Sequence, residues 1–367
     1  MAVGAGYISY RYYISPTQTI PYPYFFPEKE VTNFTSELNP DDLPQILVIG
    51  DRLGKNLKNF TDKLAESLAN ETRATIKISV LAENNEGLHR TIYRLKRLKL
   101  LPPVIIYNGG TQELFEKKFH IREANKILSN IKTYQDDKVK TLLQLVPVLS
   151  KFIYHPLDRV KLKSEPYEDT SEYAAQERGQ RMEISYKLYE MEMEELIQYV
   201  SSKGKNLILI NVPINFSIYP KVVCENSSSD NIIKLQNEYF ELLKNENYKD
   251  AYNGLIELKN IMPGNALTYF MLGKACKNIG KFKEAVENFE LSSSYDCSIW
   301  RGNAIHNAII ERYAQKYNLP LLDFHLIVNK DFAQEDNLFL DEILPQHTYY
   351  QKLMEDLKKQ LKKSLNI

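Results

Sequence analysis

The stretch ILVIGDRLG, residues 46–54, decides the fold of this chain. It begins with an unbroken apolar run, which is typical of a strand covered on both faces of a sheet. The run stops at Gly50 and Asp51, and a helical pattern follows at once. This predicts the first strand of a parallel sheet, with a loop at the carboxyl edge where open α/β folds place their sites.

Strands and helices alternate along most of the chain. Further strands are predicted at residues 75–81, 104–107, 206–213 and 319–323. Helices are predicted at residues 56–70, 88–98, 122–153 and 183–202, in a stretch that ends near residue 317, and at the end of the chain. Such alternation predicts an α/β protein with a three-layer α/β/α arrangement and a parallel sheet, in which residues 46–50 lie near the centre. The polar residues 164–181 are expected to form a surface excursion or a lid.

A second pattern interrupts this alternation. Four positions recur 34 residues apart, namely Tyr248, Lys249, Ala251 and Leu255 as Phe282, Lys283, Ala285 and Phe289. The spacing resembles a pair of tetratricopeptide (TPR) repeats, although Cys297 replaces the proline that ends the second unit; two unrelated helical hairpins are the alternative. The resemblance implies an all-α insertion over residues 231–297 that binds a protein partner. Its partner-binding candidates are Tyr239, Tyr248, Tyr269 and Phe282.

Composition excludes several classes of function. Lys plus Arg and Asp plus Glu are both 47, so no global field attracts nucleic acid, and no nucleic-acid partner is expected. The histidines lack the spacing of a metal site, and no metal or cofactor is predicted. Cys224, Cys276 and Cys297 form no C-x-x-C pair, which favours free, mostly buried thiols.

Residues 1–45 are predicted to form an extended N-terminal arm. Tyr, Phe and Pro dominate residues 20–27, and the prolines disfavour both helix and central strand. The apolar residues 2–10 are too few to span a bilayer, but they are compatible with the tail of a longer membrane anchor. An ordinary chain terminus is the equal alternative.

Three loops together resemble the GDSL or SGNH hydrolase family. They are the first-strand stretch, YNGGTQE at residues 107–113 and FLDEILP at residues 339–345. The resemblance covers residues 46–230 and 298–367. It implies an SGNH or flavodoxin-like sheet, divided into two parts by residues 231–297, as also occurs in bacterial members of the family. Active members attack an ester or acyl carbonyl with a serine that follows Gly-Asp.

The nucleophile and the base of the family are both replaced in this chain. Arg52 takes the position of the serine, and a guanidinium has no nucleophilic atom. Leu344 takes the position of the histidine in the last loop, where only the orienting carboxylate, Asp341, is left. Because Asp341 has lost its usual partner, we predict a semi-buried bidentate ion pair between Arg52 and Asp341, with Asp51 or Glu113 as second choices.

The oxyanion hole implied by the resemblance is altered as well. Gly110 is kept, but Gln112 replaces the asparagine that donates to the oxyanion, which displaces the amide by one methylene. Gly87 is a weaker match to the glycine that completes the hole. This region is therefore expected to be a remnant of a catalytic site.

Two functions follow from these observations. The first is a catalytically inactive SGNH-like scaffold or assembly protein, which binds a protein partner or larger assembly through the helical insertion and has a possible membrane tether at its N-terminus. A periplasmic or other extracytoplasmic location is favoured, with a cytoplasmic one left open. The alternative is a divergent GDSL-type esterase or acyltransferase, in which His347 is the base and Thr111 or a serine from elsewhere is the nucleophile.

Overall fold

The computed structural model describes residues 25–27, 43–73, 75–116, 118–154, 160–162, 175–220, 230–297, 301–335 and 337–365. Within these residues the main sheet is five-stranded and parallel, in the order β3-β2-β4-β6-β7. The strands are β2 (Ile46–Gly50), β3 (Ile78–Val80), β4 (Val104–Asn108), β6 (Asn206–Ile210) and β7 (Leu321–Leu322). Counted along the chain this is the order 2-1-3-4-5 of flavodoxin-like sheets. The predicted parallel sheet is confirmed, with β4 at its centre and β2 beside it.

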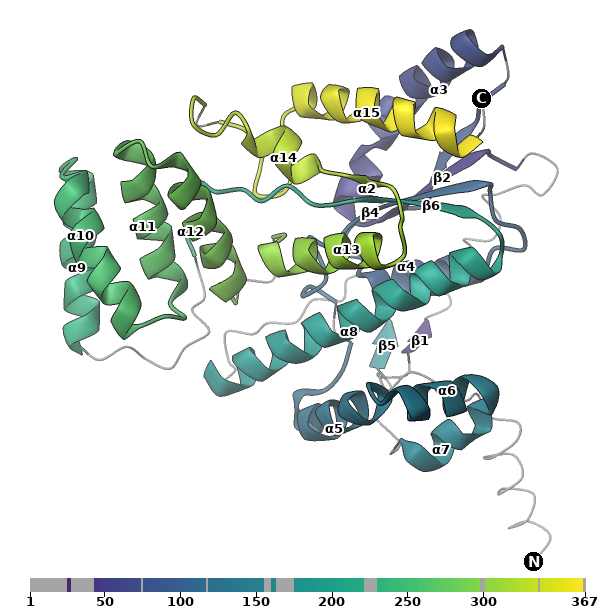
Figure 1. Cartoon of the computed structure of the whole chain (residues 1–367), viewed down its shortest axis with the longest axis horizontal. Helices are drawn as coiled ribbons and strands as arrows, with labels where there is room; N and C mark the ends of the chain where they lie inside the picture. The colour runs from purple at the N-terminus through teal and green to yellow at the C-terminus, as the bar shows by residue number, and fades with distance from the viewer. Residues whose placement is uncertain are drawn as a thin grey trace, which may run out of the picture.

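Helices cover both faces of the sheet (Figure 1). One face carries α3 (Lys58–Thr72), α14 (Phe324–Asn329) and α15 (His347–Leu365), and the other carries α4 (Leu88–Lys96), α8 (Ala175–Ser202) and α13 (Ala304–Lys316). In β2, Ile46 and Val48 pack into the first layer, while Leu47 and Ile49 pack into the second. All four are at most 1% exposed, which explains why the strand has no polar position.

Smaller elements lie around this three-layer body. They are α2 (Arg52–Asn56), η4 (Ile121–Glu123), α5 (Ala124–Tyr134), α6 (Asp137–Leu145), η5 (Pro147–Leu149) and α7 (Ser150–Ile153), of which α5 packs against α8. The surface excursion or lid predicted over residues 164–181 is contradicted from Ala175 onward, where α8 begins, and residues 164–174 lie outside the described residues.

The described part of the N-terminal arm is a strand. Phe25–Pro27 forms β1, which pairs in parallel with β5 (Val160–Leu162) in a separate two-stranded sheet. The apolar residues 2–10, considered above as the tail of an anchor, lie outside the described residues. Within the described ranges, no helix has both the length and the apolar character that a bilayer span requires.

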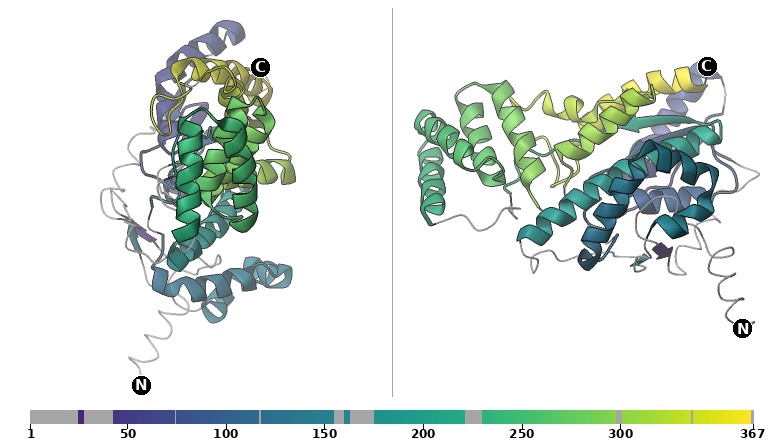
Figure 2. Two further views of the ribbon diagram at one scale, coloured as in Figure 1. Left: turned by 90° about the vertical axis from the view of Figure 1, so that its left-hand side faces the viewer. Right: turned by 60° about the horizontal axis from the view of Figure 1, so that its bottom comes forward.

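Residues 230–295 form helices that project from one end of the molecule (Figures 1 and 2). We call α9 (Asp230–Lys244), α10 (Tyr248–Ile261), α11 (Ala266–Asn278) and α12 (Phe282–Tyr295) the helical module. A Cβ at Gly273 of α11 would lie 3.0 Å from the Phe289 ring of α12, and one at Gly254 of α10 would lie 2.3 Å from the Tyr239 ring of α9. Each helix pair therefore approaches closely because a glycine lies under an aromatic ring.

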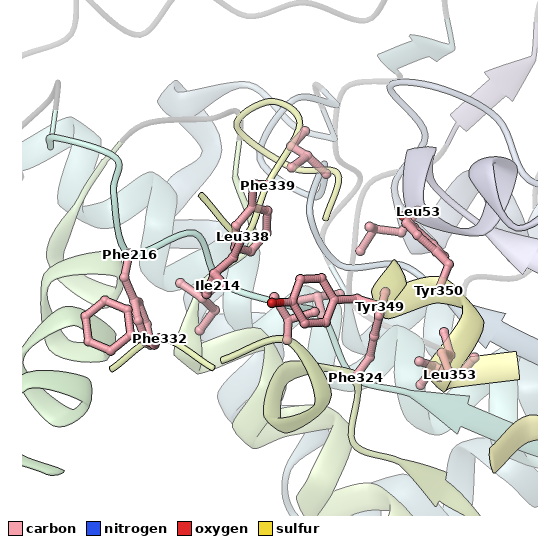
Figure 3. Packing of buried hydrophobic residues seen from close by; sticks show 14 of the residues in the cluster. Leu53, Ile214, Phe216, Phe324, Phe332, Leu338, Phe339, Tyr349, Tyr350 and Leu353 are labelled. Atoms are coloured by element: carbon pink, nitrogen blue, oxygen red, sulfur yellow. The ribbon is translucent and has the colours of Figure 1, made fainter. Parts of the chain in front are cut away.

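The helical module shares its core with the α/β body. Phe289 stacks on Phe216, from the segment after β6, with ring centroids 5.3 Å apart, and meets Phe332 at 5.5 Å. Figure 3 shows Phe216 and Phe332 side by side at this junction. The same apolar cluster continues to Ile46 and Val48 of the sheet. The module is thus held by the body from which it projects.

The return of the chain from the module to the sheet is fixed covalently. Cys297, directly after α12, is disulfide-bonded, whereas Cys276 is buried and free. The prediction of free thiols was therefore wrong for Cys297, because sequence spacing does not report which cysteines meet in space. Beside it, Arg301 Nη2 and Asp296 Oδ2 form a buried ion pair at 2.5 Å.

The shared core predicts one cooperative unfolding transition. Phe289→Ala should lower the free energy of unfolding of the whole protein by about 3–5 kcal/mol, since it removes a buried ring at the junction. Phe282→Ala is the matched control, because that ring is 44% exposed. Thermal unfolding followed by circular dichroism measures both. A separate early transition of the module, with the sheet unaffected, would contradict the shared core.

Candidate functional site

The loops after β2 and β4 meet at the carboxyl edge of the sheet. Gly50 has a φ of 134°, and a Cβ there would lie 2.1 Å from the Asn108 carbonyl oxygen. Only glycine combines this conformation with so close an approach. In doubly wound sheets of this strand order, the edge between the first and third strands is where sites form. The structure therefore brings the first-strand stretch and residues 107–113 together, as predicted.

Asp51 ties these two loops together. Its carboxylate is 1% exposed and accepts hydrogen bonds from Gly110 N (3.0 Å), Thr111 N (2.7 Å) and Thr111 Oγ1 (2.7 Å), and also from Leu53 N (2.9 Å) at the start of α2. Burial raises the pKa of Asp51 to about 6, against the lowering effect of these hydrogen bonds. Asp51 is a structural tie between the loops.

The ion pair expected between Arg52 and Asp341 is present in the structure. Arg52 Nη2 lies 2.6 Å from Asp341 Oδ2, and about a third of each side chain is exposed. The other carboxylate oxygen, Oδ1, accepts from Ile343 N and Leu344 N at 2.8 Å each. The bidentate geometry expected from the sequence is therefore not formed, because one oxygen is used by the turn. Leu344, which the resemblance of the loops puts in the position of a histidine, packs against the apolar cluster beside α15.

Gln112, at the position of the oxyanion asparagine, is turned toward the protein itself. Its Oε1 accepts from Asn85 N at 2.7 Å and from Arg52 N at 3.4 Å, and its Nε2 donates to Asn85 Oδ1 at 3.0 Å. The amide that would donate to an oxyanion is thus engaged. The backbone N–H of Arg52 donates to the same side chain.

The two glycines of the predicted oxyanion hole are engaged in the same way. Gly87 N donates to the buried Glu116 Oε2 at 3.0 Å, and Gly110 N donates to Asp51. An oxyanion hole needs donors that are aimed at an empty position where charge develops. Here each donor already has an internal acceptor.

The alternative base and nucleophile also have other contacts. His347 is exposed at the start of α15, and its ring meets the edge of Phe60 at 5.7 Å. Thr111 is 1% exposed and donates its hydroxyl proton to Asp51. Thr111 is therefore buried beneath the surface, and the described contact of the His347 ring is with Phe60.

One histidine beside the site was missed in the sequence. His306 of α13 is 1% exposed, lies between the rings of Tyr186 and Tyr189, and is near Gly110, whose added Cβ would be 3.6 Å from the His306 Cβ. Burial, assisted by Lys118, lowers the pKa of His306 to about 3. It is therefore neutral and too weakly basic for general base catalysis near neutral pH.

Beneath the site lies a set of charged side chains that no sequence pattern indicated. We call it the buried ionic cluster: Glu86, Arg90, Arg94, Glu113, Glu116, Lys118 and Glu192. Lys118 Nζ lies 2.8 Å from Glu113 Oε2 and 2.6 Å from Glu192 Oε2, and the ion-paired side chains are at most 8% exposed. Four carboxylates face three cations, so one acid is in excess.

Burial raises the pKa values of two carboxyl groups in this cluster. It raises the pKa of Glu192 to about 8 and that of Glu86 to about 7, although Lys118 and Arg94 respectively oppose the shift. A proton held by the cluster removes the excess negative charge. Among the residues that the structure describes, no three His, Cys, Asp or Glu side chains are placed so that they could hold a metal ion together.

A groove of about 520 Å³ lies at the junction of the helical module and the α/β body. We call it the junction groove. Of the predicted partner-binding residues, Tyr248 lines it, and Phe282 is exposed outside it. Tyr269 is only 4% exposed and donates its hydroxyl proton to Pro263 O at 2.7 Å, so its assignment to a binding surface was wrong. Tyr239 packs over Gly254.

No protein-family model matches this chain, and no curated protein matches it either. Solved structures similar to it include the following two. One is a candidate acylhydrolase from Bacteroides fragilis NCTC 9343, with 9% identity, a TM-score of 0.41, and coverage of 92% of this chain and 96% of the other. The second is a GDSL-like lipase from Bacteroides thetaiotaomicron VPI-5482, with 8% identity, a TM-score of 0.40, and coverage of 91% and 98%.

The ion pair is tested by a double-mutant cycle. Arg52→Ala should lower the free energy of unfolding by about 1 kcal/mol, because the pair is partly exposed and joined at one contact. Asp341→Asn should cost a similar amount, since it keeps an acceptor for the turn, whereas Asp341→Ala should cost about 1–3 kcal/mol. Arg52→Ala with Asp341→Asn should be less than additive in urea unfolding. Strict additivity would show that the pair carries no coupling energy.

Stability should also depend on pH. Asp51, Glu86 and Glu192 have raised pKa values, whereas His89 and His306 have lowered ones that oppose them below about pH 6.5. Between about pH 6.5 and pH 8 the folded state therefore holds more protons than the unfolded state, and the free energy of unfolding falls as the pH rises. Glu192→Gln should flatten this slope, because a neutral amide has no proton to lose. Glu190→Gln, on the same helix but in an exposed pair with Arg312, should leave it unchanged. An unaltered slope in Glu192→Gln would refute the role of Glu192.

Proposed function

We propose that this chain is a catalytically inactive SGNH-hydrolase-like protein that acts by binding a protein partner. The observation that carries the proposal is the Arg52 to Asp341 ion pair at 2.6 Å. It occupies the two positions where an active member of the family has its nucleophile and the carboxylate that orients its base. A guanidinium held by this carboxylate leaves no group able to attack a carbonyl.

The surrounding contacts support the same proposal. Gln112 and Gly87, which would stabilise an oxyanion, donate their N–H groups to Asn85 and Glu116 instead. The esterase or acyltransferase alternative needs His347 as base, and its ring lies against Phe60. This alternative therefore has less support than the non-catalytic function.

Partner binding is assigned to the helical module and its surroundings. The 34-residue spacing between Tyr248 and Phe282 supports a TPR-like module, and paired helices of this kind present surfaces to peptides and other subunits. The disulfide at Cys297 favours an oxidising, extracytoplasmic compartment, such as the periplasm of a bacterium. A membrane tether through the N-terminal residues is part of the proposal, and nucleic acid is not.

The catalytic part of the proposal is tested with p-nitrophenyl acetate. The unaltered protein should hydrolyse it at the rate of the buffer alone. Arg52→Ser with Leu344→His restores a hydroxyl and a base, but should still give little turnover, because the N–H at position 52 and the Gln112 amide remain engaged. Adding Gln112→Asn is the better rescue, since the shorter side chain withdraws from Asn85.

Ester hydrolysis by the unaltered protein would favour the alternative function. Turnover by the unaltered protein that disappears in His347→Ala would establish the divergent esterase. Arg52→Ala alone is the control for this assay, because it removes the guanidinium without supplying a nucleophile. Its activity should equal that of the buffer.

A further inference from the structure

The buried ionic cluster joins three separate parts of the chain. Its members come from the loop after β4, from the start of α4 with the residues before it, and from α8, which packs beside α4 on one face of the sheet (Figure 1). Lys118 of the loop links these parts. Its Nζ lies 2.8 Å from Glu113 Oε2 in the same loop and 2.6 Å from Glu192 Oε2 on α8.

Two carboxyl groups of the loop cap the start of α4. Leu88 N donates to Glu113 Oε1 at 2.7 Å, and Gly87 N donates to Glu116 Oε2 at 3.0 Å. Burial raises the pKa of Glu116, and Arg90 opposes this rise by donating from Nε to Oε1 at 3.1 Å. Because N–H groups at the start of a helix stabilise acidic side chains, these contacts hold the loop against α4.

Glu192 is the acid of the cluster that lacks a donor at one oxygen. Both oxygens of Glu86, Glu113 and Glu116 accept hydrogen bonds. Glu192 Oε2 shares Lys118 with Glu113, whereas Glu192 Oε1 is buried and has no hydrogen-bond partner within the described ranges. Since four acids face three cations, we place the excess proton of the cluster on Glu192.

The surroundings of Glu192 supply little positive charge. His89 Nδ1 lies 3.8 Å from Glu192 Oε1, but burial and Lys118 lower the pKa of His89 well below its usual range, so the ring is neutral. Among the described residues, Lys118 is the one cation paired with Glu192. The other titratable or charged groups nearby are Glu113 and Glu116 of the loop, Arg90 of α4, Tyr189 of α8 itself and the neutral His306 of α13.

We propose that the buried ionic cluster is a pH-sensitive latch, in which one proton on Glu192 keeps the loop after β4 and the start of α4 attached to α8. When Glu192 is ionised, the single ammonium of Lys118 has to neutralise two carboxylates, and the charge on Glu192 Oε1 has no donor. Release of the two segments lets water reach this charge.

The latch acts on the degenerate site. The segments that it holds carry Gly87 and Gln112, whose N–H groups donate to Glu116 and Asn85 in the closed state. The latch therefore controls whether these donors keep their internal acceptors. It does not depend on the proposed binding function, because its groups belong to the α/β body.

The direction of the pH effect follows from the closed and open states. In the closed state burial raises the pKa of Glu192 to about 8, against the attraction of Lys118, whereas a solvated carboxyl group has an ordinary value. The closed state therefore binds the proton more tightly, and the population of the open state rises with pH up to about pH 8 and is constant above it. One such group gives a rise of about eightfold between pH 7 and pH 8.5.

The test is hydrogen–deuterium exchange of the full chain, followed by mass spectrometry of peptides that contain the Gly87 and Leu88 amides. Their protection factors, which are corrected for the intrinsic pH dependence of exchange, should fall about eightfold between pH 7 and pH 8.5. In Glu192→Gln they should not change with pH, because the amide keeps an acceptor for Lys118 and has no proton to lose. Glu190→Gln, in an exposed pair with Arg312 on the same helix, is the matched control and should behave as the unaltered protein.

The amides of α11 are the internal reference, and their protection should be the same at both pH values. Constant protection of Gly87 and Leu88 in the unaltered protein would overturn the latch, and this measurement needs no variant to fold. An equal fall in Glu192→Gln would also overturn it, because the proton would then belong to another group, such as Glu86, whose pKa burial raises to about 7. A fall shared by α11 would overturn it as well, since the whole protein would then be opening.

Discussion

One buried carboxylate organises the carboxyl edge of this sheet. Asp51 receives hydrogen bonds from Gly110 and Thr111 of the loop after β4, and from Leu53 at the start of α2. A buried acid is stable only if its oxygens are satisfied, so the geometry of both loops is set by this one group. The position of Arg52 follows directly, because it is the next residue along the chain. From there its guanidinium reaches Asp341 on a third loop.

The general fold could be predicted from short-range patterns, since burial on both faces leaves β2 entirely apolar and the helical periodicity marks each connecting helix. The ion pair was also predictable, because the altered positions Arg52 and Leu344 left the Asp341 carboxylate without its family partner. Other features depend on residues that meet only in the folded chain. Lys118 and Glu192 are 74 residues apart and belong to no motif. The same holds for the disulfide at Cys297 and for the junction groove, whose floor combines Phe216, Phe289 and Phe332.

A catalytic site must keep donors and nucleophiles without internal partners, and such groups cost stability. In this chain, the donors at the carboxyl edge of the sheet have internal partners. Gln112 accepts hydrogen bonds from the backbone N–H groups of Asn85 and Arg52, and Glu116 accepts one from the N–H of Gly87. The Asp341 carboxylate accepts one from the N–H of Ile343 in its own turn. These loops are consequently well braced and have little capacity to reorganise around a reacting carbonyl.

The braced loops have a structural consequence at the other end of the molecule. The segment from Leu338 to Asp341 runs from the groove wall to the Arg52 ion pair, and Asn215 joins the same segment to the strand extension after β6. Packing of Phe289 against Phe216 and Phe332 then carries this rigidity into the helical module. A preformed groove loses less conformational entropy when a partner binds than a mobile one does. The Arg52 ion pair and the packing of Phe289 therefore preform the wall of the junction groove.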